Sequence, residues 1–318
     1  MNRRHFISAK NISDPVALAK EAIALKKDPF AFETLGKRKT LCMIFLNASL
    51  RTRLSTQKAA RNLGMDVVVM NMSSDGWQLE TAEGVVMDGG KAEHVKEAAA
   101  VIGQYCDVLA IRSFPGLVNK EADYAEEMIT SMVEYSGVPV VNMESGTRHP
   151  LQSLADIITI EEHKKIDKPK VVLTWAPHIK PLPQAVSNSF AEWINKTDYD
   201  FVITHPKGYE LDSEFVGNTP IEYDQEKAFA GADFIYTKNW SAVSNYGKVL
   251  EGDFSSWTID GQKMGLTNNG KFMHCLPVRR NVIVADEVLN GDQSIVIPQA
   301  GNREFSAQIV LKKILEQL

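Results

Sequence analysis

The residues best suited to chemistry lie at positions 49–53, which read Ser-Leu-Arg-Thr-Arg. This group follows an apolar run of strand length and precedes a helical pattern over residues 54–63. The first turn of a helix exposes unpaired N–H groups and the positive end of its dipole, so it attracts anions. Arg51 can hold two phosphate oxygens through its planar fork, and Ser49 can cap the helix. We therefore expect an anion site here; the alternative is a capping serine followed by solvated arginines.

Polar side chains also follow two further apolar runs of strand length. Arg112 ends one run, where a guanidinium is placed to meet a ligand at the carboxyl edge of a sheet; the alternative is a structural ion pair. Glu144 ends the next run, and His149 and Gln152 follow at the start of a helical pattern. His149 and Gln152 can both donate to a carbonyl oxygen or amide, whereas Glu144 can attract a substrate ammonium. These types suit the capture of a small phosphate ester with a polarised carbonyl.

Three motifs together resemble the aspartate and ornithine transcarbamylases: residues 47–53 (Asn-Ala-Ser-Leu-Arg-Thr-Arg), 149–152 (His-Pro-Leu-Gln) and 274–277 (His-Cys-Leu-Pro). The first usually reads Ser-Thr-Arg-Thr-Arg in that family, so Leu50 keeps the backbone amide and removes one hydroxyl. The resemblance covers essentially the whole chain and implies carbamoyl transfer from carbamoyl phosphate to an amine. It implies Arg112, His149, Thr52 and Arg303 as the catalytic residues. The implied carbamoyl phosphate-binding residues are Ser49, Leu50, Arg51, Thr52, Trp77, Arg112, His149, Pro150, Leu151, Gln152 and Arg303.

The acceptor amine is indicated by what the chain lacks. Ornithine transcarbamylases bind the free α-amino acid end with an Asp and a Ser-Met-Gly segment, and residues 238–242 here read Lys-Asn-Trp-Ser-Ala. A lysine at this point repels an α-ammonium and suits a carboxylate or an acylated amine. The chain resembles the N-acylornithine branch of the family. That branch implies six acceptor-binding positions, with Cys275 binding substrate rather than attacking it: Glu144, His178, Lys238, Cys275, Leu276 and Arg279.

The acyl group depends on Ala92, which matches the position that distinguishes the two types in the branch. Acetyl-specific members of that branch have Glu at this position and the succinyl type has Pro, so Ala matches neither. A small uncharged residue neither repels nor obstructs an added carboxylate. We therefore expect N-succinyl-L-ornithine as acceptor and N-succinyl-L-citrulline as product, in arginine biosynthesis. N-acetylornithine, ornithine itself, another amine, and a non-catalytic phosphometabolite-binding protein are the alternatives.

Composition restricts the partners. The 318 residues carry a formal net charge of -5, which argues against nucleic acid as a partner. The sequence contains no run of eighteen apolar residues, so no membrane segment is indicated. Three cysteines are too few for a disulfide framework, so we expect a cytoplasmic protein. The sequence has no cluster of His or Cys residues that would indicate a metal site, and we expect no cofactor. The family resemblance implies a homo-oligomer, a trimer, in which the loop bearing Trp77 reaches a neighbouring subunit's active site.

The elements that position these residues alternate between apolar strands and amphipathic helices. This pattern predicts an α/β fold of two doubly wound parallel-sheet lobes, one for carbamoyl phosphate and one for the amino acid, with the active-site cleft between them. We expect a first domain over residues 1–150, joined by a C-terminal helix at 301–318, and a second domain over 151–300. A helix is predicted within residues 12–27, and residues 294–298 are predicted to form the last strand.

Overall fold

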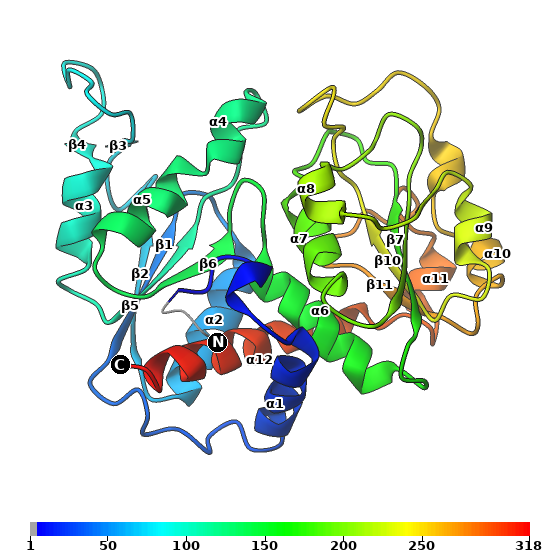
Figure 1. The fold of residues 1–318 in the computed structure, drawn as a ribbon, viewed down its shortest axis with the longest axis horizontal. Helices are drawn as coiled ribbons and strands as arrows, with labels where there is room; N and C mark the ends of the chain where they lie inside the picture. Colours follow the sequence, from blue (N-terminus) through cyan, green and yellow to red (C-terminus); the bar gives the residue numbers. More distant parts are fainter. Residues whose placement is uncertain (1–4) are drawn as a thin grey trace. The chain divides into compact units, whose positions relative to one another are not determined.

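The structure of the chain is a computed structural model in which residues 5–318 are described (Figure 1). The chain divides into two units of similar size. The described part of unit 1 consists of residues 5–13, Glu21–Leu151 and Arg303–Leu318, and unit 2 consists of Asp14–Lys20 and Gln152–Asn302. Residues 14–20 group with unit 2 in this division, and the domains expected from the sequence stay a prediction.

Unit 1 is built on a four-stranded parallel sheet with the order β2-β1-β5-β6. Strands β5 and β6 are buried along their whole length and are almost continuously apolar, as expected for parallel strands covered on both faces. The register pairs Phe45 with Arg112 and Arg112 with Glu144, so the carboxyl ends of three strands lie side by side. The strands are β1 (Thr40–Phe45), β2 (Asp66–Asn71), β5 (Val108–Arg112) and β6 (Val140–Glu144).

Helices cover both faces of this sheet (Figure 1). Val95 and Ala99 of α3 and Met132 of α5 share a buried cluster with sheet residues such as Leu109. On the other face α2 and α12 are joined by hydrogen bonds from Asn62 Nδ2 to Glu304 Oε1 (2.9 Å) and Gln308 Oε1 (3.0 Å). The remaining elements of the first half are η1 (Ala9–Asn11), α1 (Pro15–Lys27), α2 (Leu50–Asn62), β3 (Leu79–Glu80), β4 (Glu93–His94), α3 (Val95–Ile102), α4 (Lys120–Ala125) and α5 (Glu127–Tyr135).

Unit 2 contains a second parallel sheet, of five strands in the order β11-β10-β7-β8-β9. Its strands are β7 (Lys170–Trp175), β8 (Asp200–Thr204), β9 (Ile221–Glu222), β10 (Phe234–Lys238) and β11 (Lys271–Met273). Phe190 of α7 stacks on Tyr236 of β10 with ring centroids 4.2 Å apart, while Phe229 and Val288 lie in the main core cluster. The helices are α6 (Pro150–His163), α7 (Ala185–Ile194), α8 (Ser213–Val216), α9 (Gln225–Phe229), η2 (Ser255–Trp257), α10 (Gly261–Met264) and α11 (Asp286–Asn290). The predicted α/β class with parallel sheets is confirmed.

The predicted strand at residues 294–298 is wrong. Helix α12 (Val296–Leu315) begins there, and Ser294 contributes only an isolated bridge to Phe272. Pro298 is its third residue, where a missing N–H removes no helical hydrogen bond, so the proline fits the first turn of a helix. Among residues 5–318 no helix is both long and apolar enough to cross a membrane. Cys42, Cys106 and Cys275 are free thiols and are buried.

Gly103 provides a test of how closely α3 and α5 approach each other. It caps α3, and a Cβ atom added to it would lie 1.8 Å from the carbonyl oxygen of Ser136 at the end of α5. Backbone cannot move aside as a side chain can, so we expect Gly103→Ala to lower the free energy of unfolding by about 3 kcal/mol. Gly89→Ala is the control, since a Cβ there meets nothing within 4 Å. Urea titration of both variants measures the difference, and equal midpoints would contradict this packing.

Candidate active site

The start of α2 is open to an anion. Ser49 occupies the N-cap position with φ -152° and ψ 118°, but its side chain makes no capping hydrogen bond. The capping role considered for this hydroxyl is therefore not observed, and the N–H groups of the first helical turn keep their capacity to bind a ligand. Leu50 is 71% exposed and offers its amide. The Nε atom of Arg51 is buried and has no hydrogen-bond partner among the described residues.

Thr52 is joined to the C-terminal helix by Arg303. The guanidinium Nη2 of Arg303 donates to Thr52 Oγ1 over 2.5 Å and lies 3.5 Å from His149 Nε2. All three residues are buried, and they come from the starts of α2 and α6 and the middle of α12. Unit 1 therefore brings together three of the four residues expected to be catalytic.

Arg112, the fourth, forms a buried ion pair with Glu144. The pair joins the carboxyl ends of β5 and β6, and Glu144 Oε2 also lies 3.5 Å from His149 Nε2. Glu144 was expected to contact the acceptor, and the structure places it in unit 1 beside the carbamoyl phosphate residues. Arg112 has the carboxylate partner of the alternative interpretation, yet its Nε is buried without a hydrogen-bond partner in residues 5–318. Glu144 pairs with Arg112, and Arg303 adds a second guanidinium beside His149, so the cluster favours an anion.

His149 is held neutral. Burial is the main cause of a pKa well below the ordinary value of histidine, and the charges of Arg303 and Arg112 lower the pKa further. A neutral imidazole carries one N–H donor and one acceptor nitrogen. The Nδ1 atom is buried and has no partner within the described part of the chain. His149 can therefore present a hydrogen-bond donor to a ligand oxygen without carrying a charge of its own.

Gln152 presents an acceptor in addition to the donor expected of it. Its Nε2 donates to Asp156 Oδ1 over 2.8 Å, one helical turn further along α6. Its Oε1 is buried and has no protein partner in the chain from residue 5 onward. The assignment of the amide follows from this network, because a carboxylate accepts and does not donate. A ligand that reaches Gln152 can therefore donate to Oε1 through an N–H or O–H group.

Pro150 and Leu151 begin α6 and have mainly structural contacts. Pro150 is the first helical residue, where its missing N–H costs no hydrogen bond. The Leu151 side chain is buried, and its carbonyl oxygen accepts from Ser306 Oγ over 2.6 Å. These contacts tie the start of α6 to α12 within unit 1.

Unit 2 brings together three side chains of the expected acceptor set, which are His178, Lys238 and Arg279. Arg279 Nε donates to His178 Nε2 over 3.2 Å, and His178 Nδ1 lies 2.8 Å from the carbonyl oxygen of Lys180. Burial lowers the pKa of His178, and the nearby charges of Lys238 and Arg279 lower it further. Lys238 ends β10 and is 8% exposed. The group presents two positive charges beside a largely neutral imidazole.

Cys275 and Leu276 follow β11 in the same unit. Cys275 is 8% exposed and contacts the hydroxyl of Tyr236, whose pKa is raised chiefly by burial. Leu276 has a left-handed backbone (φ 55°), which is unusual for a residue other than glycine. Its N–H donates to His274 Nδ1 over 2.9 Å, which holds the chain in this conformation.

Trp77 and Ala92 lie apart from these groups in the chain. Trp77 is 55% exposed and donates from Nε1 to Glu93 Oε2 over 2.9 Å, and Ala92 is the exposed neighbour of Glu93. Strands β3 and β4 pair Leu79 with Glu93, so the two expected ligand contacts share one projecting segment. Within residues 5–318 Trp77 has no hydrogen bond to the cluster around Arg112.

Sequence reasoning missed two carboxylates that hold site residues. Asp156 orients Gln152, and the spacing of four residues on one helix was a usable signal for this pair. Glu126 contacts the segment just before His149, and no motif or periodicity pointed to it.

Comparisons with known proteins agree with the site. The domain family described as "Aspartate/ornithine carbamoyltransferase, carbamoyl-P binding domain" matches residues 4–162, and "Aspartate/ornithine carbamoyltransferase, Asp/Orn binding domain" matches residues 183–314. The cluster of Thr52, Arg112, His149 and Arg303 thus falls partly in the first match, with Arg303 in the second.

Individual relatives cover nearly the whole chain. An N-succinylornithine carbamoyltransferase of Bacteroides fragilis (strain 638R) is 58% identical over 317 residues, which are 99% of each chain. An N-acetylornithine carbamoyltransferase of Xanthomonas axonopodis pv. citri is 34% identical over 339 residues, covering 100% of this chain and 98% of the relative. A crystal structure of a glutamate-to-alanine mutant of N-acetyl-L-ornithine transcarbamylase, complexed with carbamyl phosphate and N-succinyl-L-norvaline, has a TM-score of 0.90 and 34% identity, covering 98% of this chain and 99% of the other. The chain belongs to the aspartate/ornithine carbamoyltransferase family, in its N-acylornithine branch.

Proposed function

We propose that the protein is an N-succinylornithine carbamoyltransferase. It transfers the carbamoyl group of carbamoyl phosphate to the δ-amine of N-succinyl-L-ornithine, and the products are N-succinyl-L-citrulline and phosphate in arginine biosynthesis. The observation that supports the chemistry best is the neutral His149 beside the Arg112 and Arg303 guanidiniums. Such fixed donors stabilise negative charge that develops on a carbonyl oxygen.

Carbamoyl phosphate is assigned to the cluster in unit 1. The phosphate binds the open N–H groups at the start of α2, with Ser49, Arg51 and Thr52 around it. Arg112, His149 and Arg303 face the carbonyl oxygen, while Gln152 Oε1 accepts from the carbamoyl N–H₂ group. This division explains why Gln152 has its amide nitrogen engaged and its oxygen without a protein partner.

The proposed step involves the two substrates and these residues. The neutral δ-amine attacks the carbonyl carbon, the bond between that carbon and the phosphate oxygen breaks, and the departing phosphate accepts the amine proton. The neutral δ-amine and carbamoyl phosphate are held close together, so proximity and fixed dipoles supply most of the rate gain.

The acceptor is assigned to residues of unit 2, and the acceptor contact expected of Glu144 stays a prediction. Lys238 and Arg279 offer positive charge to carboxylates of the acceptor, and His178 lies against Arg279. A free α-ammonium would be repelled by Lys238, whereas an acylated nitrogen is uncharged. Cys275 and Leu276 complete this set.

The succinyl group is favoured by two observations. The Bacteroides relative at 58% identity is named for N-succinylornithine, whereas the acetylornithine relative is 34% identical. The solved glutamate-to-alanine mutant of the acetylornithine enzyme is complexed with a succinyl compound, and alanine is the residue at position 92 here. Ala92 is exposed on the segment that also bears Trp77, so we propose that this segment completes the site of a neighbouring copy in a trimer. A cytoplasmic location stays a prediction.

A substrate panel tests the acceptor. With carbamoyl phosphate fixed, we expect kcat/KM for N-succinylornithine to exceed that for N-acetylornithine and ornithine by at least about tenfold, since one well-placed charge pair supplies that ratio. Ala92→Glu should reverse the preference between the two acyl compounds, because an added carboxylate repels the succinyl end. The measurement is the rate at which each acceptor is converted to its carbamoylated product. Equal use of all three acceptors would overturn the assignment of the acyl group.

Removal of a guanidinium tests the carbamoyl phosphate site. Arg51→Ala and Arg112→Ala should each lower kcat/KM by about a thousandfold or more, because each removes a charged donor that acts in the transition state. Arg61→Ala, on the exposed last turn of α2, is the matched control and should remain within about twofold of the parent. Circular dichroism should show an intact fold for Arg51→Ala and Arg61→Ala. Arg112→Ala should be less stable, because it leaves the Glu144 carboxylate buried without its partner, so its turnover is compared per folded molecule. Near-normal turnover of Arg51→Ala would refute the assigned phosphate site.

The buried neutral imidazole predicts how stability responds to acid. The folded state lowers the pKa of His149, so the unfolded chain binds the extra proton first, below about pH 6.5. The native state therefore loses stability as the pH falls from about 6.5 toward the folded pKa, by up to about 2 kcal/mol at pH 5. His149→Gln should show a correspondingly smaller loss between pH 7 and pH 5 in urea titrations. An identical pH dependence in both proteins would mean that the histidine is not held neutral.

A further inference from the structure

The segment that connects two site residues has its own support. Residues 145–148 join Glu144, at the end of β6, to His149, just before α6. Ser145, Gly146 and Thr147 are buried. Any shift of this segment would displace the imidazole and the carboxylate beside Arg112 together. What holds the segment therefore bears on the geometry of the site.

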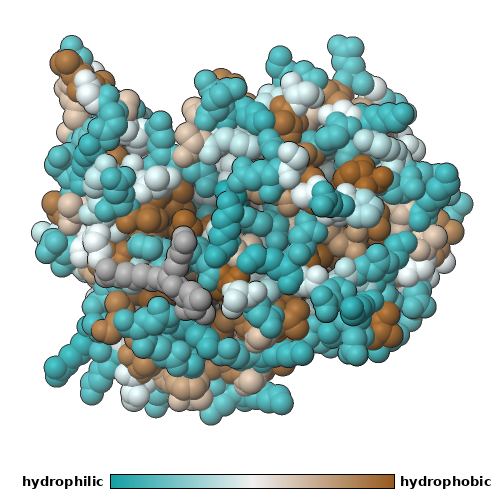
Figure 2. All heavy atoms as spheres, viewed as in Figure 1, coloured by the Kyte–Doolittle hydropathy of each residue, from teal (hydrophilic) through white to brown (hydrophobic). Residues whose placement is uncertain are grey.

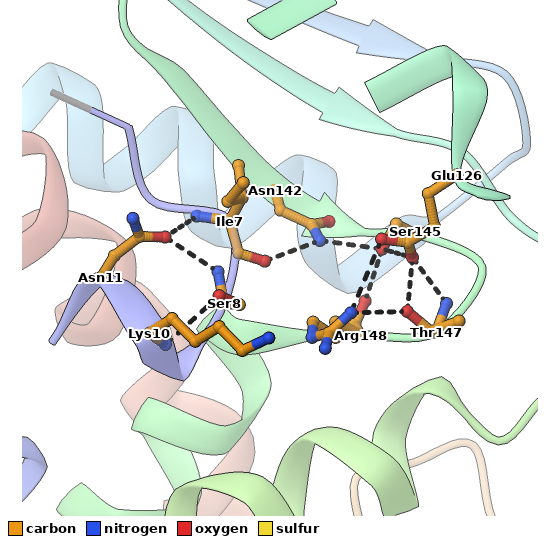
Figure 3. Close-up of polar contacts among 9 residues, drawn as sticks. All are labelled: Ile7, Ser8, Lys10, Asn11, Glu126, Asn142, Ser145, Thr147 and Arg148. Atoms are coloured by element: carbon orange, nitrogen blue, oxygen red, sulfur yellow. Dashed lines mark hydrogen bonds and ion pairs between the residues drawn. The ribbon is translucent and has the colours of Figure 1, made fainter. Parts of the chain in front are cut away.

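Glu126 provides most of that support (Figure 3). Its Oε1 atom accepts three hydrogen bonds: from Ser145 Oγ (2.5 Å), from the Thr147 N–H (2.7 Å) and from Thr147 Oγ1 (2.7 Å). Its other oxygen, Oε2, lies 3.9 Å from Arg148 Nη1. Ser145 Oγ in turn accepts from Asn142 Nδ2 of β6 over 2.9 Å. One carboxylate oxygen thus fixes both a side chain and the backbone of the segment.

The backbone at Glu126 is adapted to this contact. It links α4 to α5 in a left-handed conformation, with φ 50° and ψ 36°, which non-glycine residues rarely adopt. Such conformations persist where surrounding contacts determine them, and here the three hydrogen bonds to Oε1 do so. Gly146 also packs against this region, since a Cβ added to it would lie 2.3 Å from the carbonyl oxygen of Asp123.

The same junction holds two other segments of unit 1. Asp123 accepts from the N–H groups of Gly116 and Leu117, over 2.9 and 2.8 Å, a few residues after Arg112. Glu127 Oε2 accepts from Thr81 Oγ1 over 2.8 Å, on the segment that bears Trp77 and Ala92. We call Asp123, Glu126 and Glu127 the α4–α5 corner. It touches the segments that follow Arg112, precede His149 and connect β3 to β4.

We propose that Glu126 is a positioning residue of the carbamoyl transfer site, acting through Ser145 and Thr147 on His149 and Glu144. The inference rests on the proposed function. The relevant property is the placement of one acceptor atom, because all three hydrogen bonds end on Oε1. The negative charge itself is secondary, since Oε2 lies 3.9 Å from Arg148 Nη1, beyond hydrogen-bond distance.

Two substitutions separate placement from charge. Glu126→Gln keeps an oxygen at the position of Oε1 and removes the charge, whereas Glu126→Asp keeps the charge and withdraws the oxygen by one methylene. We expect Glu126→Gln to keep kcat within about threefold of the parent, and Glu126→Asp and Glu126→Ala to lower kcat by at least about tenfold. KM for the acylornithine should change by less than about twofold in each. Glu121→Gln, an exposed residue on α4, is the matched control and should leave kcat unchanged.

Steady-state kinetics of the full chain, with thermal melts of every variant, distinguishes a positioning role from an effect of charge or of stability. Similar melting temperatures for the Gln and Asp variants with unequal kcat support a positioning role. An active Asp variant with an inactive Gln variant would overturn it, because charge would then be the relevant property. Losses of kcat that simply follow the fraction unfolded, or equal kcat in all variants, would also overturn it.

A separate readout keeps this inference distinct from the proposed function. If the parent protein turns over none of the acylornithines, the proposed function fails, and calorimetric titration with carbamoyl phosphate then tests Glu126. We expect at least about tenfold weaker binding in Glu126→Asp and near-parent binding in Glu126→Gln. Equal affinity in the two variants would overturn the positioning role by itself.

Discussion

The ion pair between Arg112 and Glu144 is the contact on which the arrangement of unit 1 depends. Two opposite charges are buried at the ends of adjacent strands, and removing either one would leave the other without compensation. The parallel register of β5 and β6 is what makes the pairing possible, with a local irregularity between Ile111 and Arg112. Because Glu144 also approaches His149, the pair orders the edge of the sheet where the helix α6 begins.

The polar groups at the strand ends differ in character between the two units. Unit 1 gathers donors for an anion: uncapped helix N–H groups, guanidiniums and a neutral imidazole. Unit 2 gathers Lys238 and Arg279 beside His178, in keeping with an acceptor that carries carboxylates. Figure 2 shows hydrophilic side chains widely distributed over the viewed face, with smaller hydrophobic areas among them. In each unit the site residues named here lie at, or soon after, the carboxyl ends of parallel strands.

Sequence reasoning was accurate wherever burial alone determines structure. The apolar runs that became β1, β5, β7 and β10 are covered on both faces, so their composition is informative. It failed at residues 294–298, where an apolar segment with a proline reads equally as a strand or as the first turn of a helix. It did not foresee that Asp156 engages the amide nitrogen of Gln152, or that Glu144 pairs with Arg112, because side-chain partners across the fold have no local signal. The family was predictable from three short motifs and its branch from residues 238–242, because such segments can be compared with a family without knowledge of the fold.

One contact has a bearing on how the protein is made. Thr52 lies near the beginning of the chain and Arg303 near its end, and 251 residues separate the two partners of this hydrogen bond. During synthesis the ribosome therefore completes every strand of unit 1 long before the guanidinium that finishes its polar cluster emerges. A nascent chain that has folded its first sheet still lacks this donor, so the growing polypeptide cannot form the complete cluster until residue 303 has been synthesised.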